Sequence, residues 1–457
     1  MKPIVAIIIA ATALSLGSCK LGQKYVKPSN TGMPTAFDPT VQTDTISIAD
    51  LKWQEVYSDS ILQSLIEKTL ANNKDLLAAD ARIKELAAQS RVAKADLFPS
   101  ITGNAYTQKE ALNYGGDGFS NDPEIGIKLS IGWEADLWGN LRWAKDRSIA
   151  QLLGSIEAQR ALKISLIAQV AQAYFELVAL DHEYNIVSRT LQARKEGVRI
   201  AKLRFEGGLT AETSYLQAQV EYARTATYLP VLERNIALKE NQISLLTGSY
   251  PDHIERAEFK ADVPLPETLP VGLPSALLEK RPDIRQAEQQ LIAANAEVGI
   301  AYTNRFPRLT LTAQGGLESE EFANFLKSPM YFLSAGLIGP VFDMGRRQAA
   351  YRAKQAAYEQ ANLQYEKTVL QAFTDVKNAI VTFKKVEDIY TKWRELEQSA
   401  KATMDLAQLQ YINGVISYIN VLDAQRSYFD AQIGLSNAIR DKRLCLVQLY
   451  KSLGGGW

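Results

Sequence analysis

The sequence repeats itself once, at an offset of 206 to 208 residues, and this feature constrains its fold more than any other. Five segments of the first half recur in the same order in the second, at Asp75 and Asp283, Phe98 and Phe306, Asp136 and Asp343, Gly208 and Gly414, and Gly248 and Gly454. A repeat of this length indicates that one structural unit is duplicated within the chain.

Prolines show where the two copies meet and where helices can run. Five of the 16 prolines fall between residues 251 and 274, whereas none lies between Glu124 and Leu229 or after Val341. An interior proline costs a helix about 3 kcal/mol, so the proline-free stretches can form long helices. The cluster predicts an extended connection over 249–274, between a first repeat over 53–248 and a second over 275–457.

The proline-free stretches carry helical patterns. Apolar residues from Ile164 to Val178 recur at alternating spacings of three and four, which is the pattern of a coiled-coil seam. Glycines at the ends of these stretches supply the left-handed conformation that ends a helix. We therefore predict one helical hairpin per repeat, over about 139–247 and about 345–453, with a kink at Pro230.

Four shorter segments follow a period of two, over about 100–110, 124–136, 308–318 and 330–341. Each has one apolar and one polar face and the length of a transmembrane β-strand, although a soluble sheet packed on one side shows the same alternation. Four strands cannot close a barrel, and open sheet edges are not tolerated in lipid. If these strands span a membrane, several chains must share one barrel.

Composition excludes several classes of protein. The 51 Lys and Arg residues balance 51 Asp and Glu residues, so the basic surplus of a nucleic-acid-binding protein is absent. Two cysteines and two histidines exclude a disulfide scaffold and leave little for a zinc site. The sequence also lacks phosphate-binding and dinucleotide-binding motifs. We expect no catalytic residues, no metal site and no cofactor apart from a covalent lipid.

That lipid is predicted from the first residues. A basic start, a short apolar run and a small pair of residues before Cys19 are typical of a signal peptide over 1–18. The segment from Leu16 to Cys19 resembles a bacterial lipobox, after which Cys19 would be acylated and anchor the extension 19–52 firmly. Ordinary signal cleavage beside an incidental cysteine is the alternative. The second thiol, Cys445, lies in an apolar helical stretch and is expected in the core.

Several motifs in this order resemble the outer-membrane efflux protein family, the TolC-like channels, in the lipoprotein branch that serves tripartite drug or metal efflux systems. They are the lipobox with Tyr25-Val-Lys-Pro28, the Arg281-Pro-Asp283 run, Asp136-Leu-Trp-Gly139, the Val421-Leu-Asp-Ala-Gln-Arg426 run and the ending Leu449 to Trp457. Together they cover essentially the whole mature chain.

The resemblance implies a mainly helical fold with a small β part. A homotrimer would form a twelve-stranded barrel in the outer membrane, continuous with a long helical barrel in the periplasm. It would act as a passive duct for small solutes such as drugs, with a periplasmic adaptor and a proton-driven inner-membrane pump as partners. A type I secretion duct for proteins, and a non-conducting lipid-anchored periplasmic scaffold, remain as alternatives.

The resemblance also implies residues of a gate. Asp423 would face the channel axis, where three copies form an acidic ring that favours cations, although a solvated helix carboxylate is the alternative. Tyr411 matches a closed-state tyrosine whose usual aspartate partner is Ser214 here, and a position that holds arginine in some members is Ile416. A salt-bridge latch is therefore absent, while Tyr411 and Ser214 can still hydrogen-bond.

The turns of the hairpins are the implied contacts for the adaptor. They contain Gly208 and Leu209 in the first repeat and Gly414 and Val415 in the second. These glycines also end the helices, and the two roles are compatible.

Overall fold

The structure is a computed structural model of the whole chain, and it describes residues 20–28, 34, 36–37, 51–112, 115–116, 120–260 and 274–455. The predicted signal peptide, Cys19 and residues 261–273 of the proline-rich connection lie outside these ranges. The chain forms two compact units. Of the described residues, unit 1 contains those within Met1–Asn30, Ala81–Glu157 and Arg285–Lys367, and unit 2 contains those within Thr31–Asp80, Ala158–Ile284 and Thr368–Trp457.

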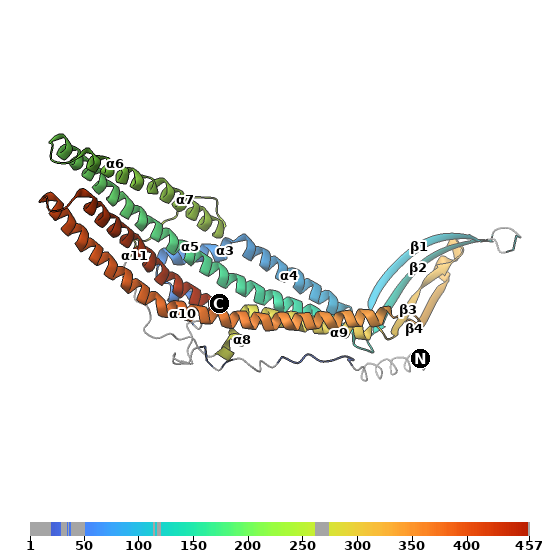
Figure 1. Cartoon of the computed structure of the whole chain (residues 1–457). Helices are drawn as coiled ribbons and strands as arrows, with labels where there is room; N and C mark the ends of the chain where they lie inside the picture. The colour runs from blue at the N-terminus through green and yellow to red at the C-terminus, as the bar shows by residue number, and fades with distance from the viewer. Residues whose placement is uncertain are drawn as a thin grey trace. The chain divides into compact units, whose positions relative to one another are not determined.

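Both repeats contain the same succession of elements (Figure 1). The first has α4 (Lys74–Ala95), β1 (Ser100–Leu112), β2 (Ser120–Ala135), α5 (Asn140–Glu206), α6 (Glu212–Ala226) and α7 (Tyr228–Leu246). The second has α9 (Pro282–Thr303), β3 (Arg308–Ser319), β4 (Pro329–Ile338), α10 (Arg346–Ile412) and α11 (Tyr418–Ser452). Short helices are α2 (Trp53–Val56), α3 (Ser60–Asn72), η2 (Pro274–Ala276), α8 (Leu277–Lys280) and η3 (Phe322–Lys327). The predicted fold class, mainly helical with a small β part, is confirmed.

Unit 1 contains one antiparallel sheet in the order β1-β2-β3-β4, and Figure 1 shows the four strands curving together. The central pair joins the two repeats, since β2 runs beside β3 from Ile125 opposite Ser319 to Ala135 opposite Leu309. Each compact unit therefore contains segments of both repeats. The proline-rich connection separates the two repeats along the chain, but it does not separate the two compact units.

One face of this sheet is apolar. Directly opposed residues of antiparallel strands lie on the same face, and the register places Ile131 between Ile101 and Ala313. Large apolar side chains on this face are exposed, namely Ile101, Ile127, Leu129, Ile131, Leu333 and Leu337. On the opposite face the Tyr106 hydroxyl donates to Glu318 at 2.7 Å and accepts from Lys128 at 2.9 Å.

The two long helices begin in the same way. Glycines with positive φ precede them, 84° at Gly139 and 81° at Gly345. Asp136 accepts hydrogen bonds of 3.0 and 3.1 Å from two backbone N–H groups in the first turn of α5. Asp343 accepts bonds of 3.2 and 3.4 Å around the start of α10. The repeated aspartate and glycine therefore start both helices.

Unit 2 has its core around the middle of α5, where the predicted seam is buried. Its members include Ile167, Ala171, Tyr174 and Val178 of α5, with Leu62 and Ile66 of α3, Ile243 of α7 and Tyr450 of α11. One 18-residue window of α5 is apolar enough to cross a membrane, but 61% of it is buried within the protein, as expected of a core helix. Cys445 is also buried, as predicted, and burial raises its pKa to about 11.

The returning helix of the first hairpin is interrupted near its proline. α6 ends at Ala226 and α7 begins at Tyr228, with Thr227 between them. Pro230 lies in the first turn of α7, where its missing N–H removes no intrahelical bond. The predicted kink is thus a break at Thr227, whereas the proline-free α11 is continuous.

In unit 2 the end of each hairpin is tied to the helix that opens its own repeat. Asn73, just before α4, donates to the carbonyl oxygen of Leu246 at 2.9 Å. Arg281, just before α9, donates to the carbonyl oxygen of Ser452 at 2.8 Å. Arg281 also pairs with Asp283 and Asp375, at 2.6 and 3.2 Å.

In unit 1 the N-terminal segment 20–28 is fixed to helices. The Lys20 ammonium group lies 3.4 Å from the centre of the Trp143 ring and pairs with Asp146. The Trp143 indole donates to the carbonyl oxygen of Leu21 at 2.7 Å. The chain is therefore held against α5 from the first residue after Cys19.

Candidate gate at the tips of the helical hairpins

Both long helices end on a left-handed glycine, with φ of 73° at Gly208 and 74° at Gly414. The N–H of the following residue bonds back to the carbonyl five residues earlier, at 2.8 Å in the first tip and 2.9 Å in the second. This is the Schellman arrangement, which a residue without Cβ adopts at least cost. No atom lies within 4 Å of a Cβ built on either glycine, so conformation and not space requires glycine.

The predicted adaptor contacts lie at these tips and are exposed. Leu209 is 71% exposed and Val415 is 69% exposed, and both tip glycines are also open to solvent. Exposed apolar side chains on a rigid turn are available for contact with another protein.

Tyr411 is buried, with 8% exposure, at the base of the second tip. Its ring centre lies 5.2 Å from that of Tyr418 and 4.9 Å from the Arg204 guanidinium of α5. Ile416 packs against the same cluster. The buried Tyr411 hydroxyl has no hydrogen-bond partner within the described chain, so the bond that it could make to Ser214 is not formed here.

Asp423 lies in the first two turns of α11, and its side chain is 61% exposed. The Arg426 guanidinium, one turn further along, lies 2.9 Å from its carboxylate. The structure thus leaves the carboxylate open to solvent but places a cation directly beside it. Its assignment to a ring around the channel axis stays a prediction.

A buried ion-pair network near the tips was not foreseen in the sequence. Glu221 of α6 is only 2% exposed, and it accepts hydrogen bonds from Arg426 at 2.6 Å and from Arg194 of α5 at 3.1 Å. Arg194 is also buried and donates to Thr225. A signal was present, because Arg194 occupies an apolar position in the helical pattern of α5.

The electrostatics of Glu221 show that its negative charge is well compensated. Burial alone would raise the pKa of its carboxyl. The hydrogen bond from Arg426 and the charges of Arg194, Arg426 and Arg224 outweigh burial, so the pKa lies below its ordinary value. Glu221 is therefore ionised at neutral pH.

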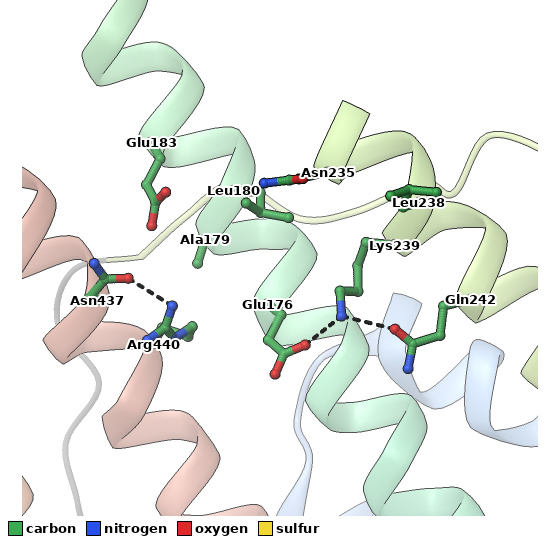
Figure 2. Close-up of a pocket in the computed structure, with 10 residues that line it drawn as sticks. All are labelled: Glu176, Ala179, Leu180, Glu183, Asn235, Leu238, Lys239, Gln242, Asn437 and Arg440. Carbon is green, nitrogen blue, oxygen red and sulfur yellow. Dashed lines mark hydrogen bonds and ion pairs between the residues drawn. The ribbon is translucent and has the colours of Figure 1, made fainter. Parts of the chain in front are cut away.

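A groove in unit 2 lies among α5, α7 and α11 (Figure 2). The Lys239 ammonium group of α7 donates hydrogen bonds to Glu176 of α5 at 2.7 Å and to Gln242 of α7 at 2.9 Å. Glu183 faces Arg440 in this view but has no hydrogen bond or ion pair among the described residues. Burial raises the pKa of Glu183, and the charge of Arg440 opposes this only in part. This charged lining is unlike a pocket for a small apolar ligand.

Within the described ranges, no group of three or more His, Cys, Asp or Glu side chains is placed to hold a metal ion.

Comparisons with known proteins agree with this geometry. The profile of the family described as "Outer membrane efflux protein" matches residues 65–249 and again 273–455. The toluene efflux pump outer membrane protein TtgC of Pseudomonas putida is 31% identical over 98% of this chain and 95% of the relative. The antibiotic efflux pump outer membrane protein ArpC of Pseudomonas putida shows the same identity and coverage. The structure of the outer-membrane channel OprN aligns with a TM-score of 0.89 at 27% identity, over 96% of this chain and 100% of that one.

The duplicated hairpin fold with its small sheet defines the class of outer-membrane channels that extend into the periplasm. The family profile matches twice because the sequence contains the internal repeat described above. The chain belongs to the outer membrane efflux protein family. It is therefore an exit duct of the outer membrane, of the kind that works in tripartite efflux systems.

Proposed function

We propose that the protein works as a homotrimer whose shared barrel forms a passive exit for small toxic organic compounds. The observation that carries this proposal is the sheet of unit 1. It has an exposed apolar face, a polar face and, within the described residues, edges at β1 and β4 that pair on one side only. Three copies supply the strands that such a sheet needs to close in lipid.

The sheet also argues against the non-conducting periplasmic scaffold. A soluble sheet packs its apolar face on a core. Here Ile101, Leu129 and Leu337 are exposed on that face, and within unit 1 no described element covers them. Burying this face in lipid removes the cost of leaving it in water.

The names of two relatives support the proposed class of cargo. TtgC is named for toluene and ArpC for antibiotics. A passive duct performs no chemistry, so we propose that the protein has no enzymatic activity and that an inner-membrane pump supplies the energy. The exposed tips, with Leu209 and Val415, would receive the periplasmic adaptor.

We further propose that Cys19 carries a lipid. Its neighbour Lys20 is clamped between Trp143 and Asp146, which would hold the acylated end of the chain at a fixed place beside α5. Cys19→Ser should abolish incorporation of radiolabelled palmitate while trimers still form. Labelling that survives in Cys19→Ser would contradict the assignment.

The duct itself is tested with purified protein in planar bilayers. We expect trimers that resist SDS until heated, and discrete current steps after reconstitution. A well-folded protein that extracts from membranes with carbonate and never carries current would contradict the proposal. Complementation of a duct-deficient strain distinguishes the cargo, because restored resistance to toluene or antibiotics without restored protein secretion excludes the type I secretion duct.

A further inference from the structure

We propose that Glu221 and Arg426 form the latch that holds the two hairpins of one protomer together near the tips. This inference rests on the exit-duct function proposed above and adds to it the residues that keep the duct closed. It assigns a positioning role to two side chains outside the predicted gate residues.

The Glu221–Arg426 pair connects the two hairpins. Glu221 belongs to α6 of the first hairpin and Arg426 to α11 of the second, and their side chains meet at 2.6 Å. The other arm of the same guanidinium lies 2.9 Å from Asp423. A planar guanidinium fixes the geometry of both carboxylates it bridges. The candidate gate carboxylate is therefore mechanically linked to the first hairpin through Arg426.

The carboxylate of this pair lies in the protein interior. Glu221 is almost fully buried, and its second oxygen is held by the buried Arg194 of α5 at 3.1 Å. Separating a buried carboxylate from one of its guanidinium partners is unfavourable, because its charge is then less well compensated. Movement of α11 away from α6 would remove Arg426 from Glu221. The pair therefore opposes separation of the hairpins.

Among the described residues, no other such bond lies at the predicted latch position. Tyr411 makes no hydrogen bond through its hydroxyl, and Ser214 and Ile416 have no charge. Contacts between the hairpins there are aromatic, apolar and cation-π. In the described part of the tips, Glu221–Arg426 is the ion pair that joins the two hairpins.

The chain offers matched controls. Arg224 also lies near Glu221, at 3.5 Å, but both residues belong to α6, so this contact joins nothing across the hairpins. Glu196 and Arg199 form an exposed pair within α5. Removal of either control charge should leave the tips closed.

The test compares Glu221→Gln and Arg426→Gln with Arg224→Gln and Arg199→Gln. Each variant is produced at the wild-type level in a Gram-negative host without the cognate pump. Entry of vancomycin, which an intact outer membrane excludes, reports an open tip, and bilayer recordings report the open fraction directly. We expect the two latch variants to raise the open fraction at least about tenfold, since a buried ion pair loses one partner. The controls should match the wild type.

Two further outcomes overturn the proposal in different ways. Latch variants that form normal amounts of trimer and stay as closed as the wild type would refute the latch and leave the duct intact. If neither the wild-type trimer nor a latch variant carries current at any voltage, the duct is refuted and the latch with it. If Glu221→Gln does not assemble, Arg426→Gln decides alone, because its side chain is 39% exposed and its loss perturbs the core less.

Discussion

The guanidinium of Arg281 lies 2.8 Å from the backbone carbonyl oxygen of Ser452, although 171 positions separate the two residues. The bond joins the start of α9 to the end of α11. In the first repeat Asn73 makes the equivalent bond to Leu246, at the end of α7. Each repeat therefore keeps a hydrogen bond between its beginning and its end, even though the donor side chain differs.

This difference predicts unequal stability effects. Arg281→Ala would leave Asp283 and Asp375 without their partner and should cost about 3 kcal/mol or more. Asn73→Ala removes a neutral cap and should cost about 1 kcal/mol. Thermal dissociation of the purified trimer, followed by gel migration, measures both. Equal losses in the two variants would show that the charges at Arg281 contribute nothing.

The tip glycines separate conformational strain from contact with a partner. Gly414→Ala should cost about 1 kcal/mol through its positive φ, with efflux preserved. Gly414→Trp and Gly208→Trp add bulk at the proposed adaptor contact and should abolish drug resistance while trimers persist. Gly116, which has φ of 94° and equally open surroundings in the β1–β2 loop, is the matched control. Gly116→Trp should retain resistance, and resistance in all three tryptophan variants would contradict docking at the tips.

Asp423 predicts ion selectivity. Three copies near a pore axis would attract cations, so Asp423→Ala should raise anion permeability relative to cations. The reversal potential in a KCl gradient measures the ratio. Asp423→Glu keeps the charge and should behave as the wild type. An unchanged reversal potential in the alanine variant would remove Asp423 from the pore.

Glu183 predicts a pH dependence. Burial raises its pKa in the folded protein above the ordinary 4.5, so the folded state binds the proton more tightly than the unfolded state. This group therefore destabilises the protein progressively as pH rises from 4.5 through the folded pKa; the loss is complete above the folded pKa and absent below 4.5. Glu183→Gln removes this charge and should be more stable than the wild type at pH 7.5. The gain should be only about 0.5 kcal/mol, because water screens a half-buried carboxyl. At pH 4 the two should melt together.

The groove provides a control of opposite sign. Glu176 lines the same groove but pairs with Lys239 at 2.7 Å, so Glu176→Gln loses an attraction and should be slightly destabilised at pH 7.5. Stabilisation of both variants would mean that general charge reduction, and not the lack of a partner at Glu183, is responsible.

Much of this fold could be read from local sequence signals. Proline-free stretches gave the long helices, and Gly208 and Gly414 gave their ends, because a left-handed turn depends on one residue. The alternation of apolar and polar residues from Ile125 to Trp133 predicted β2, because the side chains of a strand alternate between its two faces. These features are decided within a few residues of chain.

The missed features depend on distant residues. Glu221 and Arg426 are 205 positions apart, and each alone looks like a charge on a helix surface. The pairing of β2 with β3 across the repeats, which makes each compact unit mixed, is likewise set by tertiary packing. Only Arg194, a charged residue at an apolar position of the helical pattern, indicated that a buried acidic partner exists.

The two long helices, α5 and α10, contain 67 residues each, and this equality limits how the protein can change length during evolution. One inserted residue turns everything beyond it by about 100°. An insertion halfway along α5 would carry Arg194 away from Glu221 and Arg204 away from Tyr411. Tolerated changes should come in steps of about seven or eleven residues, which restore the same face. They should also arise in both helices, so that the duplicated halves lengthen or shorten as a pair.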